Sequence, residues 1–304
     1  MIYKTPDVWI VEVGPRDGLQ NEKNFVATHS KIELINELSE TGLKLIETTS
    51  FVNPERIPQL ADCAEVYQHI FKKSDIIYSA LIPNLKGMEK AIEAGIQSIA
   101  IFTAASETFN QRNINCSIDE SIERFIPVIA LAKAHHIPIR AYISCALGCP
   151  YEGYIPPEKV LAVAQKLKPF DIDDFSLSDT IGVSTPKQTK ALISLFKHDF
   201  SSEQMSMHLH DTYGQAIANV YAALELGINK FDSSLAGLGG CPYARGATGN
   251  LATEDLLYLL HGLGLHTGVD IYKIVAIGEK ICKILNRPNQ SKVARALLGG
   301  TIST

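Results

Sequence analysis

The chain has 304 residues, of which 46% are hydrophobic and 20% are charged, and its formal net charge is −5. This apolar fraction can build a core and so excludes a disordered chain, and no stretch of about 20 uncharged apolar residues exists that could cross a membrane. The mild negative charge argues against nucleic acid as a partner, because nucleic acid requires a basic face.

The cysteine content and the first residues bear on the compartment. Six cysteines in a chain of this length do not make a disulfide framework, so we expect thiols in a reducing cytoplasm. The start, MIYKTPDVWI, shows neither the apolar core of a signal peptide nor the Arg- and Ser-rich helix of a transit peptide. We therefore expect a cytoplasmic protein.

Short apolar, β-branched runs alternate along the chain with longer amphipathic runs, which is typical of alternating strands and helices. We expect strands at residues 8–13, 45–50, 76–82, 98–103, 137–144, 175–178, 205–210 and 230–235.

Capping residues and helical spacing predict the helices between these strands. Thr28 is the expected N-cap of a helix that ends at Gly42. A capping box of Ser117 and Glu120 begins a helix that reaches about residue 136. Its apolar stripe comprises Ile122, Phe125, Ile126 and Ile129. Further helices are expected from Thr185-Pro186 onward and at residues 213–226, 252–262 and 269–285.

An internal repeat supports this alternation. The form E-x-G-(L/I)-x-x-(I/F) occurs at residues 40–46, 93–99 and 225–231. A glycine there can take the left-handed conformation that ends a helix before the chain enters a strand; chance similarity is the alternative. Eight βα units in about 250 residues predict a (β/α)8 TIM barrel, an α/β fold. We expect one catalytic domain at residues 1–286, with a lid loop at 237–250, and a short C-terminal tail at 287–304.

Candidate metal ligands lie at the ends of the predicted strands or in the turns that follow them. His208 and His210 are two residues apart, so on a strand both side chains point to the same face. Asp17 follows the first strand, which in a closed barrel lies near the seventh. Two imidazoles, a carboxylate and an amide oxygen suit Mg²⁺ or Mn²⁺; packed, hydrogen-bonded histidines are the alternative. Cys145 and Cys149 have no companion pair and are expected to be buried without a metal.

Two further residues suggest catalysis. Arg16 directly precedes Asp17, and a guanidinium beside a metal can stabilise a developing oxyanion. A structural ion pair with Glu47 is the alternative, and the two roles are compatible. The loop at 237–250 has five glycines in fourteen residues, which suits either a lid or a tight turn. Cys241 on this loop could donate a proton or act as a nucleophile, although an isolated cysteine is more often inert.

Several common catalytic motifs are absent from the sequence. The chain contains no P-loop, HExxH or GxSxG motif, and GLGGCP is not a dinucleotide fingerprint. A Schiff-base aldolase would need a lysine at the catalytic end of a strand, whereas Lys44 and Lys230 begin their strands. These absences favour metal activation of the substrate.

Six motifs extend over nearly the whole chain: GPRDGLQNE at 14–22, ETTSFVNPERIPQLAD at 47–62, CALGCPYEG at 145–153, SLSDTIGVSTP at 176–186, HLHDTYGQA at 208–216 and GLGGCPYARGATGN at 237–250. Together they closely resemble the 3-hydroxy-3-methylglutaryl-CoA lyase family. The RDG and HxHD elements are shared with a wider group of metal-dependent Claisen-type lyases and synthases, whereas the cysteine loop is more specific to the lyase. Thr248 stands where the family usually has serine and keeps the hydroxyl.

The resemblance implies a reaction and a set of roles. The reaction would be a retro-Claisen cleavage that gives acetoacetate and acetyl-CoA, as in leucine degradation and ketone body formation. Arg16 would stabilise the enolate of acetyl-CoA, and Cys241 would exchange the proton that quenches it. Lys23 would lie near the CoA moiety. The metal ligands would be Asp17, His208, His210 and Asn250, with Mg²⁺ or Mn²⁺ bound, in a protein that is typically a homodimer.

The resemblance also implies that Glu47 and Asp179 shape the polar site, and either His208 or Asp179 would remove the hydroxyl proton. Three alternatives stay open. One is a condensing synthase that acts on acetyl-CoA and a 2-oxo acid, and another is a lyase for a hydroxyacyl-CoA with a larger branch at C3. The third is a catalytically silent barrel that serves as a binding protein.

Overall fold

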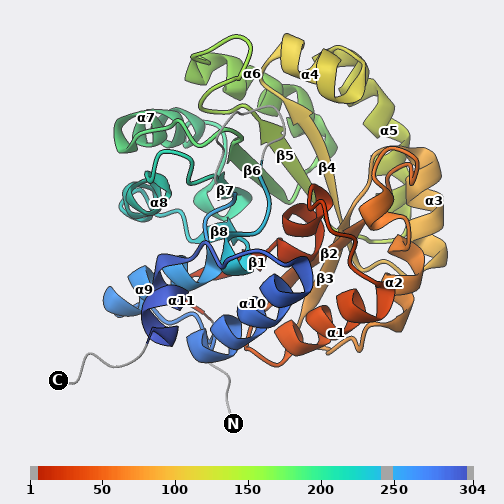
Figure 1. Ribbon diagram of the computed structural model, residues 1–304. Coiled ribbons are helices and arrows are strands. Elements are labelled where there is room, and N and C mark those ends of the chain that lie inside the picture. The colour runs from red at the N-terminus through yellow and green to blue at the C-terminus, as the bar shows by residue number, and fades with distance from the viewer. Residues whose placement is uncertain (1–5, 241–248, 300–304) are drawn as a thin grey trace.

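The computed structural model describes residues 6–240 and 249–299. Eight parallel strands form a closed barrel in chain order, in which β1 pairs with β8 (Figure 1). This confirms the predicted (β/α)8 barrel. The strands are β1 (Trp9–Glu12), β2 (Leu45–Ser50), β3 (Ile77–Leu81), β4 (Ser98–Ala104), β5 (Ile139–Ser144), β6 (Asp174–Asp179), β7 (Met205–Leu209) and β8 (Lys230–Ser233).

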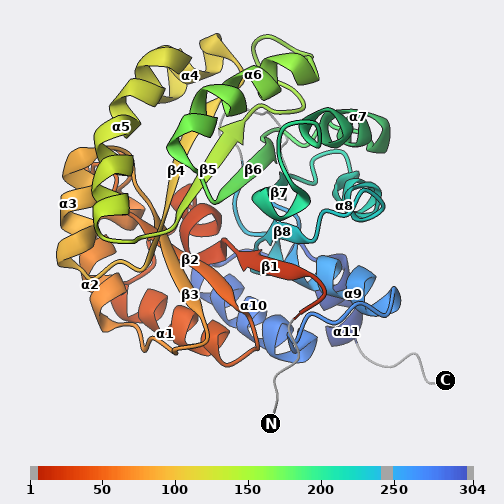
Figure 2. The same cartoon turned by 180° about the vertical axis from the view of Figure 1, so that it is seen from behind.

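The α-helices surround the strands, and α9, α10 and α11 lie beside β1 and β8 (Figures 1 and 2). They are α1 (Thr28–Ser39), α2 (Cys63–His69), α3 (Leu85–Glu93), α4 (Glu107–Ile114), α5 (Ile118–Ala134), α6 (Pro157–Leu167), α7 (Pro186–Phe196), α8 (Ala216–Leu224), α9 (Thr253–Gly262), α10 (Ile271–Leu285) and α11 (Lys292–Leu298). Short helical turns are η1 (Gly14–Gly18), η2 (Pro58–Leu60), η3 (Lys168–Phe170), η4 (Ser202–Gln204) and η5 (Leu235–Gly237). None of the helices in the described ranges combines the length and the apolar composition that a bilayer crossing requires.

The repeated glycines have the predicted conformation. Gly42, Gly95 and Gly227 have φ angles of 100°, 79° and 79°, in the left-handed region that favours glycine. At Gly42 a Cβ atom would also lie 2.0 Å from the backbone oxygen of Gly268, so this helix end tolerates no side chain. The three joints therefore share one physical cause, which supports a repeated βα unit rather than chance similarity.

The predicted helix starts are correct in part. The capping box of Ser117 and Glu120 is present at α5, and Thr185 precedes Pro186 at α7. The Thr28 prediction is wrong, because Thr28 is the first residue of α1 and its hydroxyl donates to Asp62 Oδ2 at 2.8 Å. Ile126 is 44% exposed and is therefore not part of the buried stripe of α5.

The segment after residue 286 differs from the expected patternless tail, because it contains α11. Ser291 caps this helix by accepting a hydrogen bond from the backbone N–H of Ala294. The hydroxyl of Ser291 donates to Asp255 Oδ1 of α9 at 2.6 Å. A helix of this length has too short an apolar pattern to predict, and its contacts with α9 hold it in place.

The apolar core lies mainly between the strands and the surrounding helices. On the second half of the barrel the inward-facing side chains are instead polar and buried: Arg140 of β5, Asp174 and Ser176 of β6, Ser206 and His208 of β7 and Asp232 of β8. These side chains lie inside the barrel, and His208 among them also belongs to the site described next.

Candidate active site

The turn after β1 carries the arginine and aspartate of the RDG motif. Gly14–Gly18 forms a tight π-helical turn, η1. The backbone N–H groups of Arg16 and Gly18 both donate hydrogen bonds to the carbonyl of Val13. Glu12 is buried and accepts a hydrogen bond from the backbone N–H of Gly14 at 2.8 Å. The turn therefore begins from a fixed position at the end of β1.

The two histidines lie where the strand alternation predicts. His208 is in β7 and His210 follows its end, and both are buried and line the same cavity. Their Nε2 atoms are 3.2 Å apart. Potential ligand atoms of Asp17, His208 and His210 all lie within 4.8 Å of one another. The three side chains thus converge as expected, although they come from different ends of the chain.

Asn250 completes this cluster. Its Nδ2 donates to Asp17 Oδ2 at 2.8 Å and to the carbonyl of Leu238 at 3.0 Å. Its Oδ1 is buried and has no hydrogen-bond partner within the described residues. Gly239 makes this approach possible, since a Cβ there would lie 2.6 Å from Asn250 Nδ2. A buried carbonyl oxygen without a partner, a carboxylate and two imidazoles form a donor set that fits a divalent cation.

Charge at the site favours metal binding. Burial by itself would raise the pKa of Asp17, but the positive charge of Arg16, with smaller effects of the two histidines, holds it well below its usual value. Burial first, and His208 next, lower the pKa of His210 to about 4. At neutral pH the site therefore offers a carboxylate and a neutral imidazole, which are the forms that bind metals.

Arg16 makes the predicted ion pair with Glu47. Its Nε contacts Glu47 Oε1 and its Nη1 contacts Asp17 Oδ1. Burial by itself would lower the pKa of Arg16, but Glu47 and Asp17 raise it, so the guanidinium stays charged. The ion pair fixes the arginine at the edge of the cavity, and this structural role is compatible with a catalytic one.

Tyr142 is a site residue that the sequence analysis missed. Its hydroxyl donates to Glu47 Oε2 at 3.0 Å, and Arg16 Cζ lies 5.4 Å from its ring centroid. Its ring also packs edge-on against His208, with centroids 5.8 Å apart. A tyrosine in an apolar run reads as an ordinary strand residue. The available signal was alternation, because Arg140, Tyr142 and Ser144 occupy alternate positions of one strand.

Asp232 is a second missed residue. It lies beside His208 in the β7–β8 register, and its Oδ2 accepts a hydrogen bond from His208 Nδ1 at 3.0 Å. It is buried, and burial by itself would raise its pKa, but the charge of Arg140 lowers it. The available signal was an acidic residue in the middle of a predicted strand, directly after Phe231.

Three predicted site residues lie apart from this cluster or outside the described ranges. The carboxylate of Asp179 accepts hydrogen bonds from the backbone of Val183 and from Ser184, so it holds its own loop and does not line the cavity. The strand alternation explains this, because Ser178 and Thr180 on either side line the cavity. Lys23 is exposed and does not line the cavity either. Cys241 lies outside the described residues.

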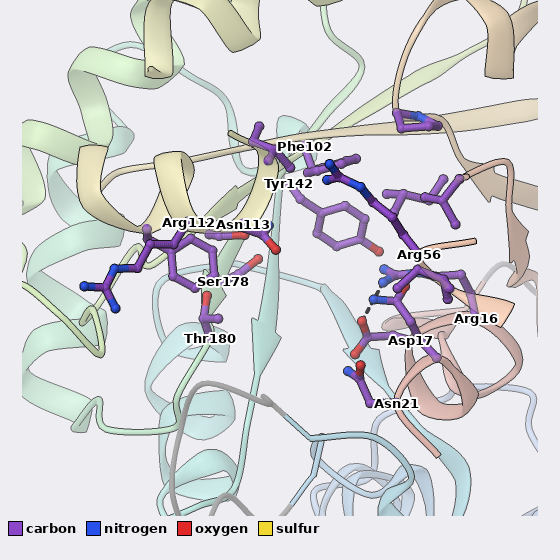
Figure 3. A pocket seen from close by; sticks show the side chains of 18 of the residues that line it. Arg16, Asp17, Asn21, Arg56, Phe102, Arg112, Asn113, Tyr142, Ser178 and Thr180 are labelled. Atoms are coloured by element: carbon purple, nitrogen blue, oxygen red, sulfur yellow. Dashed lines mark hydrogen bonds and ion pairs between the residues drawn. The ribbon is translucent and has the colours of Figure 1, made fainter. Parts of the chain in front are cut away.

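A cavity of about 810 Å³ opens above the cluster. Figure 3 shows Arg16 and Asp17 on one side of this cavity and Ser178 and Thr180 on the other. Tyr142 and Phe102 lie between these two sides. Leu81, Phe102 and Tyr142 also belong to one small apolar cluster, so the cavity has a polar side and an apolar wall. It has the volume and the mixed character of a small-molecule site.

Comparisons with known proteins agree with this geometry. A 3-hydroxy-3-isohexenylglutaryl-CoA/hydroxy-methylglutaryl-CoA lyase of Pseudomonas aeruginosa is 53% identical over 96% of this chain and 97% of its own length. A crystal structure of hydroxymethylglutaryl-CoA lyase from P. aeruginosa has a TM-score of 0.94 and 53% identity, and the match covers 96% of this chain and 97% of that one.

A cytoplasmic 3-hydroxy-3-methylglutaryl-CoA lyase of Mus musculus is 55% identical over 95% of this chain and 84% of its own length. The structure of an HMG-CoA lyase from Acinetobacter baumannii in complex with coenzyme A and 3-methylmalate has a TM-score of 0.93 and 36% identity, covering 100% of this chain and 99% of that one. The profile of the HMGL-like family matches residues 7–281. This chain belongs to the HMGL-like family.

Proposed function

We propose that this protein is a carbon–carbon lyase that cleaves 3-hydroxy-3-methylglutaryl-CoA to acetoacetate and acetyl-CoA. The observation that carries the proposal is the buried guanidinium of Arg16 directly beside the converging side chains of Asp17, His208 and His210. The 53–55% identity with relatives named as lyases for this substrate supports the same reaction.

The cluster would hold Mg²⁺ or Mn²⁺ through Asp17, His208, His210 and Asn250. This donor set of oxygen and imidazole nitrogen, without a thiolate among the described ligands, supports a hard divalent cation over structural zinc. When bound, the cation supplies Lewis acidity that lowers the pKa of the substrate's tertiary hydroxyl.

The remaining chemistry falls to side chains of this chain. Once the hydroxyl proton is removed, the bond between the carbinol carbon and the thioester's α-carbon breaks. Its electron pair then forms the enolate of acetyl-CoA, while the carbinol carbon becomes the ketone of acetoacetate. Arg16 stabilises the enolate charge, which is larger in the transition state than in the ground state. Cys241 gives its proton to the enolate carbon. Of the two bases considered, Asp179 does not line the cavity, and His208 lines it but is also one of the proposed metal ligands.

The test is an assay of the purified protein with Mg²⁺ and 3-hydroxy-3-methylglutaryl-CoA. We expect acetoacetate and acetyl-CoA in equal amounts, loss of activity with a chelator, and its return with added Mg²⁺ or Mn²⁺. Absence of acetoacetate release would refute the proposal. CoA release that depends on acetyl-CoA and a 2-oxo acid would support a condensing synthase instead, and the named relatives favour the lyase over that rival.

A larger substituent at C3 of the substrate is the second candidate specificity. The apolar wall of Leu81, Phe102 and Tyr142 supports it, and so does the name of the Pseudomonas relative, which includes an isohexenyl substrate. A panel of 3-hydroxyglutaryl-CoA analogues with methyl, isobutyl and isohexenyl groups at C3 separates the two. If kcat/KM falls by more than about 10-fold for the isohexenyl analogue, the second specificity is wrong.

We also propose a homodimer in the cytoplasm. The cysteines Cys63, Cys116, Cys149 and Cys282 are free thiols, which supports a reducing compartment, and the mouse relative is named as a cytoplasmic form. Light scattering on the purified protein would test the mass, with about twice the 33.3 kDa of one chain expected. Fractionation of expressing cells would test the compartment.

A further inference from the structure

A buried chain of charged side chains runs inside the barrel from β5 to His208. Arg140 of β5 pairs with two carboxylates, Asp174 of β6 and Asp232 of β8. Its Nη2 is 2.6 Å from Asp232 Oδ1, and its Nε is 2.9 Å from Asp174 Oδ2. All three side chains are at most 10% exposed. Buried charges of this kind are costly unless each is paired, so their arrangement needs an explanation.

The two oxygens of Asp232 have different partners. Oδ1 faces Arg140, and Oδ2 lies 3.0 Å from Nδ1 of His208. A carboxylate paired with arginine can only accept hydrogen bonds, so the proton of the His208 ring lies on Nδ1. The lone pair then lies on Nε2, the atom that faces Nε2 of His210 within the cluster. Asp232 therefore selects the tautomer of His208 that a metal requires.

The second histidine has no such support. Nδ1 of His210 is buried and has no hydrogen-bond partner among the residues that the structure describes. Of these two histidines, His208 is the one whose ring orientation and proton are set by a charged neighbour within the described residues. This asymmetry separates a specific role at His208 from general burial of both rings.

We propose that Asp232, held by Arg140, is a positioning residue that presents Nε2 of His208 to the divalent cation. The proposal rests on the metal site of the proposed function. It also has a consequence for the mechanism: with Nδ1 bonded to Asp232 and Nε2 directed at the cation, His208 has no free nitrogen to act as the base.

The competing explanation is that Asp232 only neutralises Arg140. Asp174 provides the matched control, because it pairs with the same arginine and is similarly buried but makes no contact with His208. If charge balance inside the barrel is the whole role, the Asp174→Asn and Asp232→Asn variants should behave alike.

The effect of Asp232→Asn on the tautomer of His208 can be predicted, because Arg140 sets the orientation of the new amide group. Arg140 only donates hydrogen bonds, so the amide oxygen of the variant faces Arg140 and its NH₂ group faces Nδ1 of His208. Nδ1 must then accept, and the ring proton moves to Nε2, where it blocks metal binding. We expect Mn²⁺ affinity to fall about 10- to 100-fold, the scale of losing an outer-shell partner. Asp174→Asn should bind Mn²⁺ within about 2-fold of the wild-type affinity.

Two measurements on each variant decide the matter. Calorimetric titration with Mn²⁺ gives the affinity, and long-range ¹⁵N–¹H NMR of the metal-free, ¹⁵N-histidine-labelled protein gives the tautomer. The His208 signals are identified by their loss in a His208→Gln variant. We expect an Nδ1 proton on His208 in the wild type and in Asp174→Asn, and an Nε2 proton in Asp232→Asn.

The outcomes are distinguishable. Equal Mn²⁺ affinity in wild type and Asp232→Asn would refute the positioning role but leave the proposed metal site standing. An equal loss of Mn²⁺ affinity in Asp232→Asn and Asp174→Asn would have the same meaning. A wild type that binds no Mn²⁺ refutes the proposed metal site and the positioning role with it. If Asp232→Asn does not fold, the wild-type spectrum still decides, since an Nε2 proton on metal-free His208 overturns the proposal.

Discussion

Replacement of Arg16 by glutamine tests whether its positive charge stabilises the enolate. Glutamine keeps a polar side chain but removes the only positive charge that contacts Asp17 within the described residues. The Arg16 side chain is 7% exposed at the edge of the cavity, so the charge of its guanidinium is screened much less than at the surface. A unit charge about 4 Å from the developing enolate, at an effective dielectric constant of about 20, is worth about 4 kcal/mol. That energy corresponds to about 10³-fold in kcat.

The same substitution affects folding, and the assay must separate the two effects. Glu47 is fully buried and loses its ion-pair partner, although Tyr142 still donates to it. Removal of one partner of a buried pair costs about 3–5 kcal/mol of stability. Activity should therefore be measured well below the melting temperature of the variant, with circular dichroism as a check on folding.

Arg56→Gln is the matched control, because Arg56 lines the same cavity but is exposed. Its kcat should stay within about 3-fold of the wild-type value, since an exposed charge is strongly screened. A folded Arg16→Gln variant that binds metal and keeps more than about a tenth of the wild-type kcat would refute the oxyanion role and leave only the ion pair with Glu47.

Three other predictions concern the metal, the thiol and stability. His210→Ala should weaken Mn²⁺ binding at least about 10-fold, since it removes a direct ligand; an unchanged calorimetric titration would contradict this. Cys241→Ser should fold normally yet be nearly inactive, because a hydroxyl is a much poorer proton donor than a thiol; retained acetoacetate release would assign Cys241 a structural role. Burial raises the pKa of Glu254 from 4.5 to about 8, so its contribution to stability is full below pH 4.5 and is lost as the pH rises toward 8. The Glu254→Gln variant does not undergo this loss. Its free energy of urea unfolding, compared with that of the wild type at the same pH, should therefore increase by up to about 1.4 kcal/mol per pH unit from pH 5 to 8. Identical pH profiles of the two proteins would show that the carboxyl does not titrate in this range.

Local chemistry made much of the architecture predictable. Strand and helix periodicity, the capping box at Ser117 and the repeated glycines after helices are all properties of neighbouring residues. The failures arise from contacts between segments that are distant in sequence. Thr28 has the right type for a cap, but its hydroxyl bonds to Asp62, which is distant in sequence. The helix α11 depends on Asp255 of α9 and has little pattern of its own.

By itself, the sequence determined the α/β barrel, the convergence of Asp17 with His208 and His210, and the family resemblance. It could do so because parallel strands in a closed barrel present their carboxyl ends at one face, and alternation on a strand sets which residues face inward. Only the tertiary structure decided which neighbours act on these groups. In the structure, Asp179 bonds to the loop that follows it and not to the metal cluster. Tyr142 lies between Arg16 and His208. The tertiary structure also joined Arg140, Asp232 and His208 across three strands. Such contacts depend on strand register and side-chain orientation across the barrel, and no pattern of neighbouring residues encodes them.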